Sequence, residues 1–169
     1  IMGGLAGDAL TTGSYNTALG YAALSTEDAH GKNTAIGYNT LAALNAGADA
    51  FNTAMGYKAG EAVTTGVENT LVGAGSGDAL TIGNYNTTLG AFALGLSVDG
   101  DYNTAIGYKA LQDYEDGDGN GNNTAVGALS QLNATTGEQN TSLGSLSMGI
   151  GVTTGDANVA IGASAGKRI

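Results

Sequence analysis

The sequence predicts an all-β protein, a parallel β-solenoid or β-roll of about ten coils of 17–20 residues each. Three observations predict this fold: a nine-residue block that recurs nine times, a spacing between copies near 17 residues, and the placement of every acidic residue between the blocks. Recurrence at a short, nearly fixed period is typical of stacked repeat architectures. Asn103-Thr-Ala-Ile-Gly-Tyr-Lys-Ala-Leu111 shows the block most clearly.

The block has four strict positions. The first is always Asn, the fourth always aliphatic, the fifth always Gly and the eighth always small, whereas the second is Thr in eight copies and Val in the ninth. A ladder of stacked Asn side chains, each bonded to the next coil and to its own turn, explains this invariance without a ligand. The ladder would consist of Asn16, Asn33, Asn52, Asn69, Asn86, Asn103, Asn123, Asn140 and Asn158.

The spacing of the blocks decides between repeat architectures. Successive copies are 17, 19, 17, 17, 17, 20, 17 and 18 residues apart, whereas helical repeats need about 33 to 47 residues and propeller blades about 40 to 50. One turn of a narrow β-solenoid fits, with like residues stacked at about 4.8 Å. In such a strand Asn, Ala and Gly share one face, and Thr, the aliphatic residue and Tyr share the other. We expect the first face to line a thin interior of Ala and Gly, and a neighbouring chain to cover the second.

The charges support this arrangement and exclude some partners. All 15 Asp and Glu residues lie outside the blocks, so we expect them in connecting arcs that face water. A net charge of −10 with only five scattered Lys and Arg residues argues against nucleic acid and anionic membranes, which favour clustered basic residues. No apolar run is long enough to cross a membrane, so we expect no membrane insertion by this segment.

The whole chain, residues 1–169, reads as a single repeat domain. Residues 2–10 align with residues 72–80, so we expect the chain to begin inside a coil and to be a fragment of a longer fibre protein. Ten coils would form a rod about 45 to 50 Å long. With 30 Gly and no Trp, so thin a roll has little material for a core, and we expect it to form a homo-oligomer, a homotrimer.

Two kinds of connection join the blocks. Short ones carry Thr-Thr-Gly, as at Thr64-Thr65-Gly66, and place a Gly three residues before the Asn, where we expect a positive φ at a tight corner. Longer ones occupy residues 25–32, 45–51, 97–102 and 112–122. Extra residues in a solenoid loop outward and often form its binding surface.

One long connection has metal-ligand spacing. Asp116, Asp118, Asn120 and Asn122 place oxygen ligands on alternate residues, which is similar to the first half of a calcium loop. The bidentate Glu expected at the twelfth position is absent, because Gly127 stands there. Asp99 and Asp101, one coil earlier, are candidates to complete a calcium site, and a solvated acidic turn is the alternative.

Two columns of aromatic residues flank the strand. They are Tyr21, Tyr38, Tyr57 and Tyr108 within the block, and Tyr15, Phe51, Tyr85 and Tyr102 directly before the Asn. Exposed Tyr residues can bind carbohydrate, and the alternative is packing at a corner or at a seam between chains. The Thr column suggests an ice-binding face only remotely, because a two-dimensional match to ice would need at least two such columns.

Catalytic patterns are missing from the sequence. His30 is the only histidine and has no nucleophile pattern near it, there is no Cys, and neither a Gly-x-Ser-x-Gly elbow nor a phosphate-binding loop occurs. Residues 73–77 are rich in Gly but are simply the fourth block with small substitutions. We therefore expect no enzyme, no catalytic residue and no cofactor other than the calcium considered above.

Blocks such as residues 16–24 and 103–111, joined by Thr-Thr-Gly turns, resemble those of bacterial and phage tail-fibre-type proteins. Asn158-Val-Ala-Ile-Gly162 is also similar to the core of the head repeats of trimeric autotransporter (YadA-like) adhesins, although the period here is longer. The resemblance implies a left-handed, trimeric β-roll that serves as the shaft or head of a fibre on a cell surface or virion.

The expected function is therefore a non-enzymatic structural and adhesive rod in an extracellular, cell-surface or virion fibre. It would contact a cell-surface receptor or glycan through its longer loops. The alternative is a calcium-dependent or glycan-binding module whose specificity lies in residues 97–102 and 112–122, and an ice-binding solenoid is the remote alternative.

Overall fold

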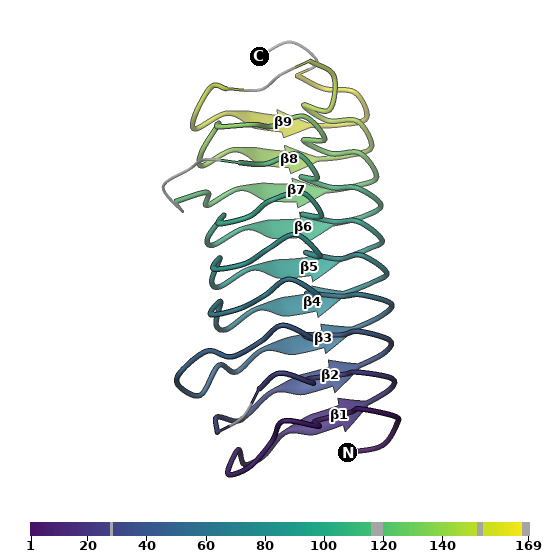
Figure 1. The fold of residues 1–169 in the computed structure, drawn as a ribbon. Helices are drawn as coiled ribbons and strands as arrows, with labels where there is room; N and C mark the ends of the chain where they lie inside the picture. Colours follow the sequence, from purple (N-terminus) through teal and green to yellow (C-terminus); the bar gives the residue numbers. More distant parts are fainter. Residues whose placement is uncertain (28, 116–119, 152–153, 167–169) are drawn as a thin grey trace.

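The computed structural model describes residues 1–27, 29–115, 120–151 and 154–166, which wind into an elongated parallel β-solenoid (Figure 1). Each copy of the block contributes one strand of three residues, and the strands stack in chain order into a single sheet. The strands are β1 (Thr17–Leu19), β2 (Thr34–Ile36), β3 (Thr53–Met55), β4 (Thr70–Val72), β5 (Thr87–Leu89), β6 (Thr104–Ile106), β7 (Thr124–Val126), β8 (Thr141–Leu143) and β9 (Val159–Ile161). The all-β parallel solenoid predicted from the sequence is confirmed.

The strands span about eight turns. The expected ten coils included the part-coil before β1, which an isolated parallel bridge from Met2 to Leu19 joins to the sheet. The described residues include no helix that is long and apolar enough for a membrane span.

The register of the sheet follows the block and ignores the length of the connection. Thr17 pairs with Thr34 across a step of 17 residues, and Thr104 pairs with Thr124 across a step of 20. Because the pairing is the same at every step, each block position forms a column along the rod. Extra residues therefore leave the stack intact, as expected for a solenoid.

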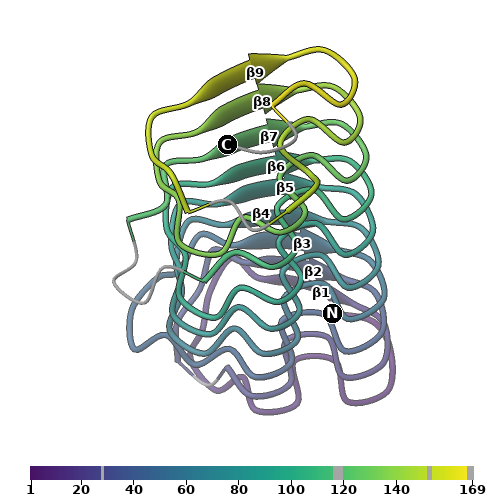
Figure 2. The ribbon, with the colours of Figure 1, turned by 90° about the horizontal axis from the view of Figure 1, so that it is seen from above.

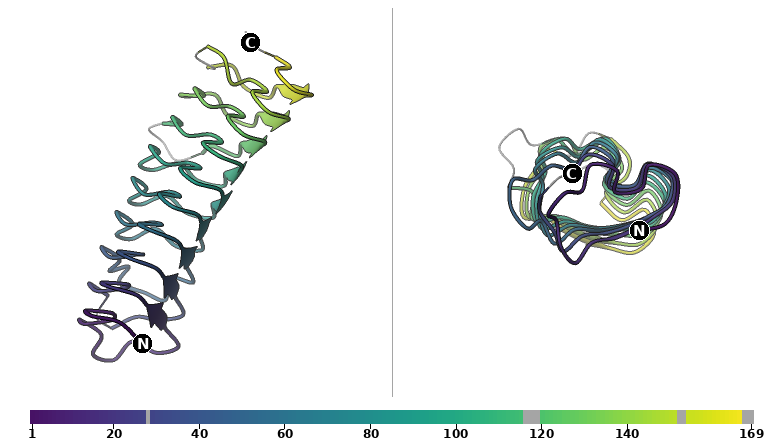
Figure 3. Two further views of the ribbon diagram at one scale, coloured as in Figure 1. Left: turned by 90° about the vertical axis from the view of Figure 1, so that its right-hand side faces the viewer. Right: turned by 60° about the horizontal axis from the view of Figure 1, so that its bottom comes forward.

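The coil is left-handed, as the resemblance implied. The strands run from left to right on the far side in Figure 1, and in Figure 2 the chain turns clockwise as it rises toward the viewer. The left view of Figure 3 shows the strands along one side of the rod. In its right view, which looks more nearly along the rod, the coils almost superimpose. The sheet thus gives the molecule one regular face that runs along its length.

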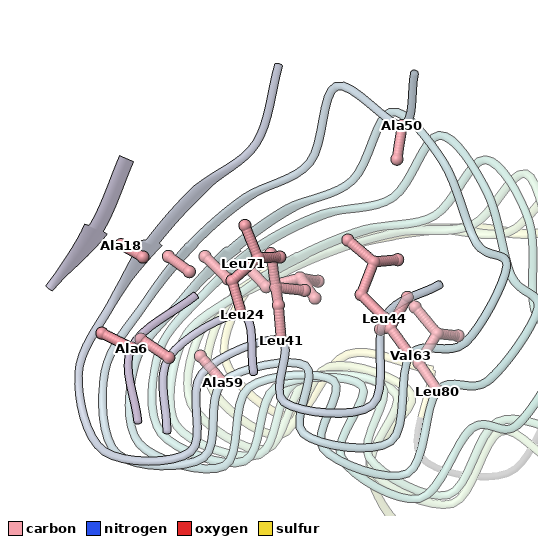
Figure 4. Close-up of a cluster of buried hydrophobic side chains, with 13 residues drawn as sticks. Ala6, Ala18, Leu24, Leu41, Leu44, Ala50, Ala59, Val63, Leu71 and Leu80 are labelled. Atoms are coloured by element: carbon pink, nitrogen blue, oxygen red, sulfur yellow. The ribbon is translucent and has the colours of Figure 1, made fainter. Parts of the chain in front are cut away.

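The interior is filled by leucine as well as alanine (Figure 4). The central residue of each strand is buried, as in Ala35 and Ala105. Two further columns, at the ninth and twelfth positions counted from the block Asn, bring in larger side chains. The largest fully buried ones include Leu24, Leu41, Leu44, Leu80, Leu94, Leu111, Tyr114 and Met148. The expected thin interior of Ala and Gly therefore also holds larger side chains, because the return path contributes buried leucines in the coils of β1, β2, β4, β5 and β6.

The invariant Gly at the fifth block position ends each strand for two reasons. Its φ lies between 121° and 145° in all nine copies, where residues with a Cβ are strained. A Cβ on Gly107 would also lie 2.6 Å from the carbonyl oxygen of Gly127 in the next coil. Backbone geometry and coil spacing together exclude any other residue.

The Gly of the Thr-Thr-Gly turns has a different role from the one expected. The predicted positive φ was wrong for Gly66 and Gly83, neither of which has one. A Cβ on Gly66 would lie 2.5 Å from the carbonyl oxygen of Gly83, so this Gly is required by close approach between coils. The positive φ falls two residues later, directly before the block Asn, at Glu68 (56°) and Tyr85 (59°).

Candidate functional site

The block asparagines form a hydrogen-bonded column inside the first corner of each coil. The main-chain N–H of every Asn after the first donates to the side-chain oxygen of the Asn one coil earlier, at 2.9 to 3.1 Å. Seven of the nine side chains are buried, and those of Asn16 and Asn158 near the two ends are partly exposed. The ladder is therefore continuous from β1 to β9.

The side-chain amide groups link the ladder to the corners. Asn52 Nδ2 donates to the carbonyl oxygen of Gly66 at 2.8 Å, and Asn86 Nδ2 donates to that of Gly100 at 2.7 Å. The same link to the next coil occurs at Asn69, Asn123 and Asn140. Each such Asn thus makes three hydrogen bonds to neighbouring coils, through its main-chain N–H, its Oδ1 and its Nδ2. Buried groups of this kind would cost free energy if they were left without partners.

Three members of the ladder differ. At the last one, Asn158 Nδ2 donates to Asn140 Oδ1 at 3.1 Å. Asn33 Nδ2 bonds to its own turn, at the carbonyl oxygen of Gly31. Asn103 Nδ2 is buried without a hydrogen-bond partner within the described part of the chain. Asn103 lies below the long connection of residues 112–122, where the next corner departs from the Thr-Thr-Gly pattern.

The proposed calcium ligands are only partly within the described residues. Asp116 and Asp118 lie outside them. Asn122 Nδ2 donates to the carbonyl oxygen of Asn120 at 3.3 Å, and the main-chain N–H of Asn122 donates to the carbonyl oxygen of Asp101 at 3.2 Å. With a φ of 50°, Asn122 occupies the corner position before Asn123.

The two acids one coil earlier have different surroundings. The side chain of Asp101 accepts hydrogen bonds from the main chain and the side chain of Asn84, so it already links two coils. Asp99 Oδ1 is buried with no hydrogen-bond partner in the described ranges. Over those same ranges, no three His, Cys, Asp or Glu side chains form a group that could hold a metal ion.

His30 lies in a connection that a buried carboxylate organises. Glu27 is fully buried and accepts a hydrogen bond from the main-chain N–H of His30 at 3.1 Å, and His30 Nδ1 lies 3.4 Å from the same oxygen. The carbonyl oxygen of His30 accepts from Asn16 Nδ2. In the next coil the hydrogen bond from Lys32 lowers the pKa of Asp49. His30 is thus a corner residue held by its neighbours.

The outward side chains of the sheet form the most extensive regular surface. We define the outer stripe as block positions two, four and six, which hold Thr or Val, an aliphatic residue, and Tyr, Ala, or Ser. None of these positions is charged in any copy. The aliphatic column consists of Leu19, Ile36, Met55, Val72, Leu89, Ile106, Val126, Leu143 and Ile161, and its members are exposed or half-buried. The threonines form one column, so the face lacks the second row that an ice lattice would need.

The aromatic columns stack ring on ring. The ring centroids of Tyr21 and Tyr38 are 5.5 Å apart and those of Tyr38 and Tyr57 are 5.4 Å apart, with nearly parallel planes. Tyr85 and Tyr102 stack at 4.7 Å. Of these rings only Tyr38 has a neighbouring ring on both faces, whereas Tyr21, Tyr57, Tyr85 and Tyr102 each stack on one side only.

The recurring Asn, Gly and small residues are thus explained by contacts between coils, whereas the recurring aliphatic residue lies in the outer stripe, which those contacts leave open. Sequence reasoning found the Asn column through its invariance and the aromatic columns through their spacing. It did not find Glu27, because the neighbouring coils hold other residues at its position; Ser97, at the same position, likewise accepts a hydrogen bond from the main-chain N–H three residues later. Comparison with known proteins adds no family: the chain matches no protein-family model, no curated protein and no solved structure.

Proposed function

We propose that this chain is a non-enzymatic structural and adhesive segment, the shaft or head of a fibre on a cell surface or virion. One observation carries the proposal: a hydrogen-bonded ladder joins every coil to the next from β1 to β9. Parallel strand pairing reinforces it at each step. Such a stack is suited to hold a tip at a fixed distance, since each coil is fastened to its neighbours by many small contacts.

The different roles of the block residues and of the connections support a structural scaffold. Asn, Gly and the small residues of the block are used in contacts between coils, so they are not available to a ligand. The longer connections, at residues 25–32, 45–51, 97–102 and 112–122, vary in sequence and length without changing the register. A receptor or glycan on a target cell would contact these connections, because they can change without disturbing the rod.

The fibre is proposed to be a homotrimer. A single coil is narrow, and the apolar part of its interior consists mainly of the alanine and leucine columns described above. Thin solenoids gain stability from neighbouring coils and from association between chains. Three parallel copies would provide a stiffer shaft than one.

The experiment that tests this function locates the protein and measures its shape. Antibodies raised against the chain should label surface fibres of the producing cell or virion in electron micrographs. The purified protein should sediment as an elongated trimer. Label confined to the cell interior would contradict the fibre role.

A calcium-dependent module is the second candidate, and one observation favours it. Asp99 Oδ1 is buried without a hydrogen-bond partner among the residues that the structure describes. It lies in the connection one coil before the one with calcium-like spacing. Thermal unfolding with added calcium and with chelator distinguishes this candidate from the fibre segment, since only a bound ion would raise the melting temperature.

A further inference from the structure

The outer stripe is uncharged, regular and uncovered in the single chain, and its central column is apolar. The aliphatic column includes Met55, Leu89 and Leu143, whose side chains are 44%, 51% and 48% exposed. They lie in β3, β5 and β8, so the exposed surface extends along the whole sheet. Contiguous apolar surface of this kind marks an interaction site more often than scattered single residues do.

The size of the stripe fits a stable interface. Nine strands at about 4.8 Å and five residues at about 3.3 Å give a projected surface of about 40 by 17 Å. That is roughly 700 Å², close to the 800 Å² that each partner contributes to a standard interface. The accessible area of protruding side chains exceeds this projection.

The repeat spacing identifies the partner. The stripe presents the same three positions nine times at the spacing of the coils, and a surface that matches it at every step needs the same spacing. Another copy of this chain has that spacing. The absence of charge at these positions allows two chains of net charge −10 to approach there, while their acids point into water. An anionic lipid surface would instead favour basic residues around the apolar ones.

We propose that the outer stripe is the seam through which copies of this chain pack side by side along a common axis. The inference rests on the oligomeric part of the proposed function and assigns residues to it. Each copy turns the Thr and aliphatic columns toward the axis, so one stripe per chain serves every contact. The connections that carry the acids and the longer insertions remain on the outside.

The test compares two triple variants with matched exposure. The seam variant is Met55→Asn, Leu89→Asn and Leu143→Asn. The control variant is Ile82→Asn, Leu96→Asn and Ile150→Asn, whose side chains are 53%, 56% and 43% exposed but lie in the connecting arcs. Sedimentation equilibrium at micromolar concentration gives the mass, and circular dichroism reports the fold. We expect the wild type and the control variant to remain oligomeric and the seam variant to fall to the monomer mass.

The outcomes separate the seam from the proposed function. If the wild type is an oligomer and the folded seam variant keeps its mass, the seam is wrong but an oligomeric rod stands. If the control variant dissociates instead, the contact lies in the connecting arcs and the seam is again wrong. If the wild type itself is a monomer, both the seam and the trimer are overturned.

A second measurement covers the case in which the seam variant does not fold. Because the chain has no cysteine, Thr87→Cys in β5 and Thr65→Cys in a corner introduce unique thiols at two exposed sites. The thiol at position 87 should resist a maleimide reagent and cross-link between copies, whereas the thiol at position 65 should react freely and give no cross-link. Free labelling at position 87 in the intact protein would overturn the seam.

Discussion

Leu71 occupies the space that Gly77 leaves empty. A Cβ on Gly77 would lie 3.0 Å from Leu71 Cδ2, and a Cβ on Gly60, in the preceding coil, would lie 2.8 Å from Leu71 Cδ1. In the coils of β1, β2 and β6 the arrangement is reversed, with Ala at the centre of the strand and Leu at the ninth position of the block, as in Ala105 and Leu111. A leucine can therefore fill the interior from either position, provided that a small residue stands at the other, as close-packed cores require.

Placing the small residue at position 71 and the leucine at position 77 should preserve the packing. Leu71→Ala alone should lower the free energy of unfolding by about 2 to 5 kcal/mol, because it opens a cavity. Gly77→Leu alone should also destabilise, because the new side chain meets Leu71. The ninth position accepts leucine at positive φ elsewhere, as at Leu41 (49°), so the double variant should recover most of the loss. Chemical denaturation of all four proteins measures the coupling, and additive losses would disprove the compensation.

The glycines at the fifth block position should tolerate substitution by alanine far less well than an exposed glycine does. Gly107→Ala should cost several kcal/mol or prevent folding, since it adds strain at a φ of 129° to a clash with the next coil. Gly47 is the matched control, because its φ of 72° is also positive but a Cβ there would meet nothing within 4 Å. Gly47→Ala should cost only about 1 kcal/mol. Equal losses of unfolding free energy in the two variants would refute the role of coil spacing.

Two members of the asparagine ladder, Asn86 and Asn103, should contribute different amounts to stability. Asn86→Ala removes the acceptor for the N–H of Asn103 and the donor to Gly100, which should lower the free energy of unfolding by about 2 to 5 kcal/mol. Asn103→Ala removes the acceptor for Asn123, but its own Nδ2 has no partner in the described residues. It should therefore cost less than Asn86→Ala. Thermal unfolding of both variants decides the order, and a greater loss at Asn103 would contradict it.

Two acids in neighbouring coils should respond to pH in opposite directions. Burial raises the pKa of Asp78 above its ordinary value, and the nearby Glu61 carboxylate adds to the effect. A carboxyl group with a raised folded pKa favours the folded state when protonated, so this stability is lost as pH rises through 3.8 toward the folded pKa. Asp78→Asn should therefore raise the melting temperature at neutral pH. The gain should vanish in acid, and a gain that persists there would contradict this cause.

Glu61 should show the reverse behaviour. Burial tends to raise its pKa, but hydrogen bonds from Asn39 at 2.8 Å and Lys58 at 2.9 Å outweigh burial and lower the pKa. Its stabilising effect is present above 4.5 and is lost as pH falls through the lower, folded pKa. Glu61→Gln should lower the unfolding free energy at neutral pH by less than about 1 kcal/mol, because both partners are partly exposed. Melting curves across the acid range test whether the difference disappears.

Chelation should leave the rod unchanged. If the fold depends on coil contacts alone, the melting temperature should be the same with calcium and with chelator. A rise with calcium that Asp99→Asn removes would instead support the calcium-dependent module. Asp156→Asn is a suitable control, because Asp156 lies in a different coil and its side chain accepts a hydrogen bond from the main chain of Glu138.

The sequence predicts the coil and its register well because each of nine copies samples the same surroundings. The Asn column and the outward Thr and aliphatic positions follow from that repetition. The leucine layer was less visible, because its residues lie beyond the strand, where connections differ in length. Leu44 and Leu80, for example, belong to one column but follow different sequence patterns.

The left-handed backbone of ordinary residues was not predictable from sequence. Lys58, Phe92 and Leu111 all have φ between 53° and 59°, a region normally signalled by Gly or Asn. The strain is held by bonds between coils, such as the one from the main-chain N–H of Lys58 to the carbonyl oxygen of Tyr38. Such strain depends on the neighbour above and below, and no local pattern reveals it.

The constant register has a consequence for how such a molecule changes length in evolution. Duplicating or deleting one unit of about 17 residues would add or remove a single step of about 4.8 Å and leave all remaining neighbours as they were. The number of repeat units encoded in the gene would then set the length of the assembled structure.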